Sequence, residues 1–165
     1  MFFLLWDASA LAQRYAPELG TLTVNALFTA VSPSQMITTV LSYSETCGVL
    51  VRKRNRGALD GATFSVARSA LRAEIIDDPD FGVMAVEFVD ILGGIDLIDR
   101  HNLNSTDASI LRSFLGFAQA QTATTACVLV AADQRLLRAA QGEGLKTFNP
   151  ELIAPADVPV FLATL

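Results

Sequence analysis

The chain has 165 residues, of which 52% are hydrophobic and 18% are charged, and its formal net charge is −5. This length is typical of one domain, and the composition argues against a disordered protein and for a large core. The pI of about 4.7 argues against a protein coated in positive charge for non-specific duplex binding, but leaves open a nucleic-acid enzyme with an acidic site.

Neither the opening residues nor the cysteines indicate export. The opening MFFLLW is too short for the apolar region of a signal peptide, and no apolar window approaches the ~18 residues of a membrane span. Cys47 and Cys127 are isolated in the sequence, so we expect two buried, inert thiols rather than a disulfide framework or a CxxC site. These features predict a cytoplasmic protein with no membrane segment.

Apolar runs and helical patterns alternate from the first residues onward. The run FFLLW, residues 2–6, is typical of a strand buried on both faces of a parallel sheet. Helices are expected at residues 8–16 and 19–31. A β-branched strand at residues 36–40 leads into a helix at residues 41–57, which has cations in its last turn.

The same alternation continues to residue 148. In chain order, we expect a helix at 60–78, a strand at 83–86, helices at 89–101 and 104–121, a strand at 127–132, a helix at 134–141 and a last strand at 145–148. The residues beyond 150 show little regular pattern. This order predicts an α/β sandwich with a central, mainly parallel β-sheet flanked by α-helices.

The sequence lacks the motifs of several common enzyme classes. His101 is the only histidine, and we expect it at the surface, so a multi-histidine zinc site is excluded. No GxSxG elbow, Walker A sequence or GxGxxG motif follows a strand, so nothing points to a hydrolase triad, a P-loop or a dinucleotide site. The remaining candidates for chemistry are carboxylates.

Acidic residues stand where predicted strands end and predicted helices begin. Asp7 directly follows the first strand, Asp133 directly follows the fourth, and Asp107 lies in the first turn of its helix. Glu45 lies one turn into the helix that follows the second strand. Because ligand sites of open α/β sheets form outside the carboxyl ends of the strands, we expect these four side chains to converge.

Each aspartate also has a purely structural explanation. Aspartate is among the best helix N-caps, and an acid in a first turn favours the helix dipole by ~0.3–1 kcal/mol. Glu45 is different because it lies beyond the cap position, between Tyr43 and Cys47, where a structural carboxylate has little reason to be. The conjunction favours a metal site, since hard divalent cations take oxygen ligands.

Four fragments, in this order, resemble the PIN-domain family and, within it, the VapC-type toxin ribonucleases. They are LLWDASALAQRYAPELG near the start, SYSETCGVLVRKRNRG around Glu45, HNLNSTDASIL around Asp107 and LVAADQRLLRAAQGEGLKTFNPE near the end. The resemblance implies a PIN-like nuclease domain at residues 1–150. Residues 151–165 are then a tail that packs on this domain or extends from it.

The resemblance implies a ribonuclease that hydrolyses RNA phosphodiester bonds with Mg²⁺ or Mn²⁺. The family's catalytic and metal-binding acids fall on Asp7, Glu45, Asp107 and Asp133. Asp7 and Asp133 would be the main ligands and Asp107 would complete the site, while Glu45 would bind through water or help to activate the attacking water. Ser9 matches the family's supporting hydroxyl, whereas Ala131 stands where the family commonly has Thr or Ser.

The basic run RKRNR, residues 52–56, has two explanations. Arg52, Lys53 and Arg56 are candidate RNA-binding residues that would hold phosphates. The alternative is a solvated helix end, because cations there complement the helix dipole in any case. Further candidates on helices beside the proposed site are Arg112, Arg135 and Arg138.

The resemblance also implies partners. Apolar surface left over in so hydrophobic a chain fits a homodimer or a docking groove for an antitoxin, as in the type II toxin–antitoxin pairs of the family. Two other functions stay open: a non-catalytic binding module that uses the acids only as caps, and a housekeeping RNA-processing nuclease of the same fold.

Overall fold

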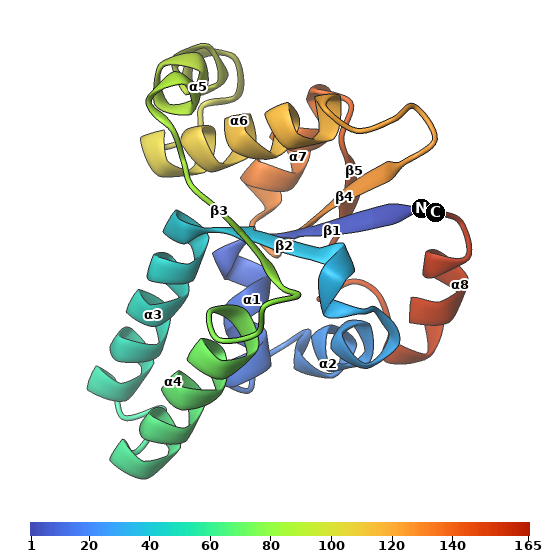
Figure 1. Ribbon diagram of the computed structural model, residues 1–165. Helices are drawn as coiled ribbons and strands as arrows, with labels where there is room; N and C mark the ends of the chain where they lie inside the picture. Colours follow the sequence, from blue (N-terminus) through green and yellow to red (C-terminus); the bar gives the residue numbers. More distant parts are fainter.

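Five short parallel strands form the centre of the computed structural model, which describes residues 1–165 (Figure 1). Their order across the sheet is β3-β2-β1-β4-β5, and every neighbouring pair is parallel. The prediction of a mainly parallel sheet is confirmed. The strands are β1 (Phe2–Trp6), β2 (Met36–Thr39), β3 (Gly82–Met84), β4 (Ala126–Val130) and β5 (Lys146–Phe148).

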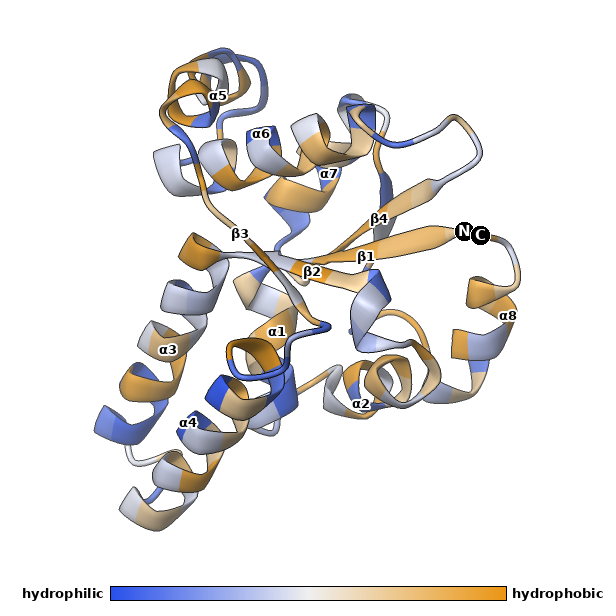
Figure 2. Cartoon of the chain, viewed as in Figure 1, coloured by the Kyte–Doolittle hydropathy of each residue, from blue (hydrophilic) through white to orange (hydrophobic).

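The central strands are buried on both faces, which explains why they read as continuous apolar runs (Figure 2). Leu4 and Trp6 point into one core, and Leu5, between them, points into the other. A side-chain period of two therefore divides the sheet residues between two separate cores.

Helices cover both faces of the sheet (Figure 1). One layer contains α1 (Ala8–Tyr15), α2 (Thr21–Ala30), α3 (Val40–Asn55) and α4 (Gly61–Ile75), and the other contains α5 (Phe88–His101), α6 (Ser105–Gln119) and α7 (Gln134–Gly142). The predicted helices all exist, and their ends differ from the predicted ends by at most three residues. No helix is both long enough and apolar enough to cross a membrane.

The glycine pair in α5 has a packing role. A Cβ atom at Gly94 would lie 3.1 Å from the backbone carbon of Ala108 on α6, tighter than nearly all real contacts. Only glycine lets the two helices approach this closely. The close contact holds the first turn of α6, and with it Asp107, against the rest of its layer.

The C-terminal tail is more regular than predicted. It forms a 3-10 turn at Pro155–Asp157 and a short helix, α8 (Val158–Leu162). Pro159 hid this helix in the sequence, but it lies in the first turn, where proline costs no helical hydrogen bond. The ring of Phe161 packs 4.6 Å from that of Phe148 on β5.

Candidate active site

The strand order places a topological switch point between β1 and β4. The chain continues from β1 to β2 on one side, whereas β4 pairs with β1 on the other, so the connections leave the sheet in opposite directions. Open α/β sheets bind ligands at the carboxyl ends of the strands at such a point. In Figure 1 these ends lie on the left, away from both termini.

Asp7 lies at this point and is almost fully buried. It is the first residue after β1, and its backbone N–H donates to the carbonyl of Val130 on β4 at 3.0 Å. Its Oδ2 caps α1 by accepting from the backbone N–H of Ser9 at 2.8 Å and from the Ser9 hydroxyl at 2.6 Å. Burial raises the pKa of Asp7, although the bonds from Ser9 act against that rise.

The Ser9 hydroxyl connects the two strand ends. It donates to Asp7 and accepts from the backbone N–H groups of Ala132 at 2.9 Å and Asp133 at 3.2 Å. One hydrogen and two lone pairs are all that a hydroxyl offers, so Ser9 is fully used. Ala131 offers no hydroxyl to this loop, which Ser9 holds from the first turn of α1.

Asp133 caps a helix with one carboxylate oxygen, and its other oxygen accepts no hydrogen bond. Its Oδ1 accepts from the backbone N–H groups of Arg135 at 2.7 Å and Leu136 at 3.0 Å, which caps α7. Its Oδ2 receives no hydrogen bond from the chain, and the residue is exposed. Because β4 ends at Val130, Asp133 lies three residues beyond the strand rather than directly after it. A cap and a metal ligand are compatible here.

Glu45 and Asp107 face this point from α3 and α6. Burial, and then the charges of Asp7 and Asp107, raise the pKa of Glu45 to about 7, while Arg52 lowers it. Burial, and then Asp7 and Asp133, raise the pKa of Asp107 to about 6. The Asn104 side chain donates to Oδ2 of Asp107 at 2.8 Å.

The four predicted acids are therefore brought together. Asp7, Asp107 and Asp133 each raise the pKa of at least one other acid of the set, and the pKa of Glu45 is raised by two of them, as expected of like charges near one another. Each also keeps a carboxylate oxygen that accepts no hydrogen bond from the chain, and Glu45 keeps both. This donor set, hard oxygens that repel one another, fits a divalent cation.

The cluster is open rather than closed. No three of these side chains already lie as close together as ligands of one metal ion do. Direct ligation by three of them would require side-chain rotation, or water molecules between an ion and the more distant carboxylates. Mg²⁺ usually keeps several of its waters, so such a site suits it chemically. That the four acids bind metal or catalyse stays a prediction.

The three predicted RNA-binding cations have different surroundings in the structure. Arg52 lies two turns after Glu45 on α3. A Cβ atom at Gly48 would lie 3.2 Å from Nη1 of Arg52, so the absence of a side chain at Gly48 leaves room for the Arg52 guanidinium. Lys53 is paired with Glu18 at 2.8 Å. Arg56 is exposed, with no ion pair. Their role in RNA binding stays a prediction.

Two residues near the acids were not singled out correctly. Asn104 caps α6 through its Oδ1 and holds Asp107 through its amide. The spacing of an N-cap and an acid three residues later was the available signal. His101 is not at the surface but partly buried, with Nε2 2.6 Å from Oε1 of Glu143.

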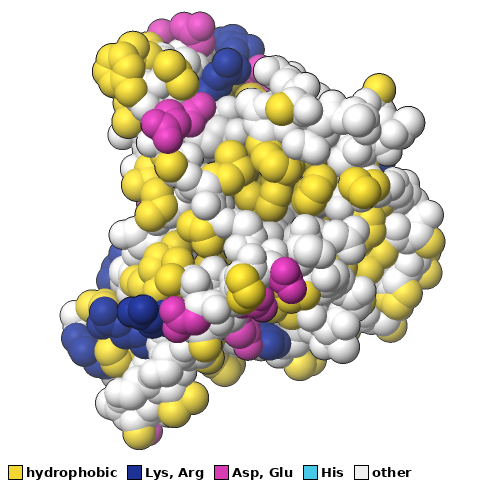
Figure 3. All heavy atoms as spheres, in the orientation of Figure 1, with side chains coloured by type: hydrophobic (Ala, Val, Ile, Leu, Met, Phe, Trp, Pro, Cys, Tyr) yellow, Lys and Arg dark blue, Asp and Glu magenta, His cyan; other side chains and the backbone are white.

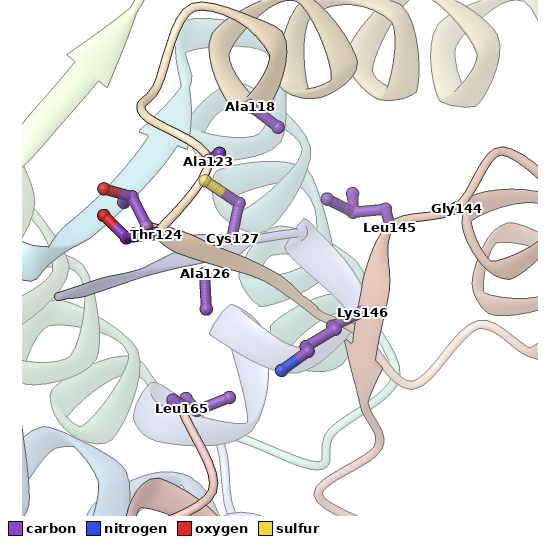
Figure 4. A pocket seen from close by; sticks show the side chains of 10 residues that line it. Ala118, Ala123, Thr124, Ala126, Cys127, Gly144, Leu145, Lys146 and Leu165 are labelled. Atoms are coloured by element: carbon purple, nitrogen blue, oxygen red, sulfur yellow. The ribbon is translucent and has the colours of Figure 1, made fainter.

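A cavity of about 370 Å³ lies at the opposite, amino end of the sheet (Figure 4). Its walls include Ala118, Ala126 and Cys127, and Lys146 is its only charged side chain. No acidic side chain lines it. The four acids are therefore not in this cavity, since they lie at the carboxyl end of the sheet.

No protein-family model and no curated protein matches the sequence. Solved structures match the fold. FitAcB from Neisseria gonorrhoeae is 14% identical with a TM-score of 0.64 over 92% of this chain and 100% of its own. PAE2754 from Pyrobaculum aerophilum is 20% identical with a TM-score of 0.63 over 99% of this chain and 97% of its own.

VapC20 from Mycobacterium tuberculosis, a sarcin–ricin loop cleaving toxin, is 16% identical with a TM-score of 0.60 over 82% of this chain and 94% of its own. At these identities the likeness is one of fold. The chain has the same fold as these structures, which confirms the predicted PIN-like α/β fold class.

Proposed function

We propose that this protein is a ribonuclease that hydrolyses RNA phosphodiester bonds with a Mg²⁺ or Mn²⁺ ion held by Asp7, Glu45, Asp107 and Asp133. One observation carries the proposal. Four carboxylates face the switch point of the sheet, the pKa values of Asp7, Glu45 and Asp107 are raised by burial and by neighbouring acids, and each of the four keeps an oxygen free of hydrogen bonds. Such perturbed clusters are typical of functional sites.

The residues have separate roles in this proposal. Asp7 and Asp133 would be the main ligands, and Asp107 would complete the set. A bound divalent cation supplies neutralisation of the phosphate charge and acidifies bound water. Glu45, with a pKa of about 7, is suited to accept the proton of the attacking water near neutral pH. Ser9 would position Asp7 and the loop that carries Asp133.

The proposed toxin role is supported by the identity of the solved structures that share this fold. They include a toxin–antitoxin complex from Klebsiella pneumoniae, 15% identical with a TM-score of 0.56 over 89% of this chain and 97% of its own. Another is FitAB bound to a DNA fragment, 12% identical with a TM-score of 0.66 over 92% of this chain and 98% of its own. We therefore propose an antitoxin as the protein partner of this chain.

A homodimer is part of the same proposal. Phe88, Ile91, Leu92 and Ile95 follow helical spacing along α5 and are each at least 50% exposed. They contribute to the apolar surface over α5 in Figure 3. A second copy of the chain would cover this stripe. Leu92→Glu should then convert a dimer to a monomer in light scattering, and a wild type that is already monomeric contradicts this part.

Cleavage of labelled RNAs tests the function. The purified protein should cut at least one member of a broad RNA panel with Mn²⁺ or Mg²⁺ and none with a chelator. An Asp7→Asn variant prepared in parallel should be inactive, which excludes a contaminating nuclease. Absence of cleavage across the panel, together with no thermal shift at millimolar metal, would favour the non-catalytic binding module.

A further inference from the structure

A second polar surface lies between α3 and α4, on the helical hairpin that leads away from the acids. A cavity of about 380 Å³ opens there, and we call it the α3–α4 groove. It is lined by Tyr43 of α3 and by Phe64, Ser65, Arg68, Ser69 and Arg72 of α4. Nothing in the proposed catalytic site uses these residues.

The groove holds two guanidinium groups that the chain does not fully use. Arg68 and Arg72 are four residues apart, about one helical turn, so they project from one face of α4. Arg68 is exposed and makes no ion pair or hydrogen bond. Arg72 contacts Asp77 through Nε alone, at 3.3 Å, in an exposed ion pair that contributes little. Its terminal nitrogens remain available.

The two serine hydroxyls of the groove, Ser65 and Ser69, make no hydrogen bond within the chain, so each can donate to a ligand. Serines elsewhere in the chain differ: Ser109 and Ser113 of α6 donate to backbone carbonyls four residues earlier, at 2.8 and 3.1 Å. Ser65 and Ser69 alternate with the two arginines on α4, so the groove presents several hydrogen-bond donors of the kind that bind phosphate oxygens.

All charged side chains that line the groove are positive. No carboxylate lines it, and Glu74 is turned toward α1, where Arg14 and Tyr15 bind it. Arg54 lies over the Phe64 ring, 4.5 Å from its centroid, and adds a third guanidinium at the border. Figure 3 shows Lys and Arg side chains gathered over α3 and α4.

Tyr43 adds an aromatic ring to the groove from the start of α3. Arg68 and Arg72 of α4 line the same groove as this ring. An aromatic ring within a positively charged groove is the arrangement with which proteins bind single-stranded nucleic acids.

We propose that the α3–α4 groove binds phosphate groups of single-stranded RNA outside the cleavage site, with Arg68 and Arg72 as the main contacts and Ser65 and Ser69 as additional donors. This inference rests on the proposed function for the identity of the ligand. The aromatic ring favours RNA over the acidic segment of a protein partner.

Binding without cleavage tests the groove. A fluorescent, mixed-sequence, single-stranded RNA is titrated in chelator with the wild type and with Arg68→Gln, and the binding constant is measured across a salt series by anisotropy. Arg68→Gln should bind several-fold more weakly, and the slope of log K against log salt should fall by about 0.7 for a lost phosphate contact. Arg68→Lys should keep the slope, because it keeps the charge.

Lys146→Gln is the matched control, because it removes one exposed positive charge from the amino end of the sheet. Equal effects of Arg68→Gln and Lys146→Gln would overturn the proposal, as would a wild type that does not bind RNA. Arg68-dependent binding of a polyglutamate peptide, with RNA binding unchanged, would also overturn it and assign the groove to an acidic protein.

The two proposals can fail separately. Arg68-dependent RNA binding in a protein that cleaves no RNA with Mn²⁺ or Mg²⁺ would support the groove and contradict the catalytic proposal. Metal-dependent cleavage by a protein whose RNA affinity is unchanged by Arg68→Gln would support the catalytic proposal and contradict the proposed RNA binding by the groove.

Discussion

The two ends of the β-sheet differ in how well their polar groups are satisfied. At the amino end, the hydroxyls of Thr122 and Thr125 lie 2.8 Å apart in a shared hydrogen bond, and Lys146 is the single charge in a cavity of about 370 Å³. At the carboxyl end, burial and neighbouring carboxylates raise the pKa values of Glu45 and Asp107, and Arg52 and Arg135 offset this rise only in part. The mutually repelling charges therefore lie at the carboxyl end of the sheet and not at this cavity.

The comparison favours electrostatics as the indicator of function. Burying like charges together lowers stability unless a ligand compensates, so a fold that keeps such a cluster has a use for it. Small residues and a lone charge at the other end need no such explanation. The following predictions test whether the two ends differ as this account requires.

Asp107→Asn should give the largest effect. Loss of a supporting residue around a metal typically costs ~10–100-fold in affinity or activity, so loss of a ligand should lower RNA cleavage by at least ~100-fold. Asn104, not Asp107, caps α6, so the fold should persist. Initial rates at saturating Mn²⁺ measure the effect, and circular dichroism checks the fold. A rate within a few-fold of the wild type would remove Asp107 from the site.

Ser9→Ala should give the next largest effect. Without the hydroxyl, Asp7 loses a bond and two backbone N–H groups lose their acceptor, so Mn²⁺ affinity should fall ~10–100-fold. Ser113→Ala is the control, since it also removes a buried hydroxyl bond but far along α6. Calorimetric titration should separate the two variants, and equal affinities would refute a positioning role for Ser9.

Glu45 should make the metal-free protein less stable as the pH rises. Its pKa is about 7 in the folded protein and near 4.5 when unperturbed, so the folded state binds the proton more tightly. Its stabilising contribution is then complete below pH 4.5 and is lost as the pH rises to about 7. In denaturant titrations with chelator, the free energy of unfolding of Glu45→Gln should rise relative to that of the wild type between pH 4.5 and 7. A constant difference would contradict the raised pKa.

Lys146→Gln should give the smallest effect. It alters the one charged side chain of the amino-end cavity, and exposed substitutions usually change stability by less than ~0.5 kcal/mol. Cleavage rate and Mn²⁺ affinity should stay at wild-type values. A large loss of either would show that the amino end takes part in function.

The sequence was informative where one physical requirement decided the pattern. Strands buried on both faces must be continuously apolar, so β1 was predicted to the residue. The acids at strand ends were found because a parallel sheet gathers these ends at one edge. The α3–α4 groove was not found, because its arginines look like ordinary exposed cations until α3 and α4 pack together.

Other features depended on tertiary contacts. The tail helix α8 is stabilised by packing of Phe161 on Phe148, which no local pattern reveals. The Gly93-Gly94 pair reads as a helix breaker, yet Gly94 serves a close helix contact. The pKa values of Glu45 and Asp107 depend on burial and on charged neighbours from other parts of the fold.

Asp133→Asn tests the central claim most directly, because it separates a helix cap from a metal ligand. Asparagine caps helices about as well as aspartate, so the bonds to Arg135 and Leu136 should survive. In chelator the variant should melt at the wild-type temperature or above, since one repelling charge is gone. With Mn²⁺ it should lose both the thermal shift and RNA cleavage. A variant that cleaves RNA like the wild type and keeps the same Mn²⁺-induced shift would show that Asp133 is only a cap.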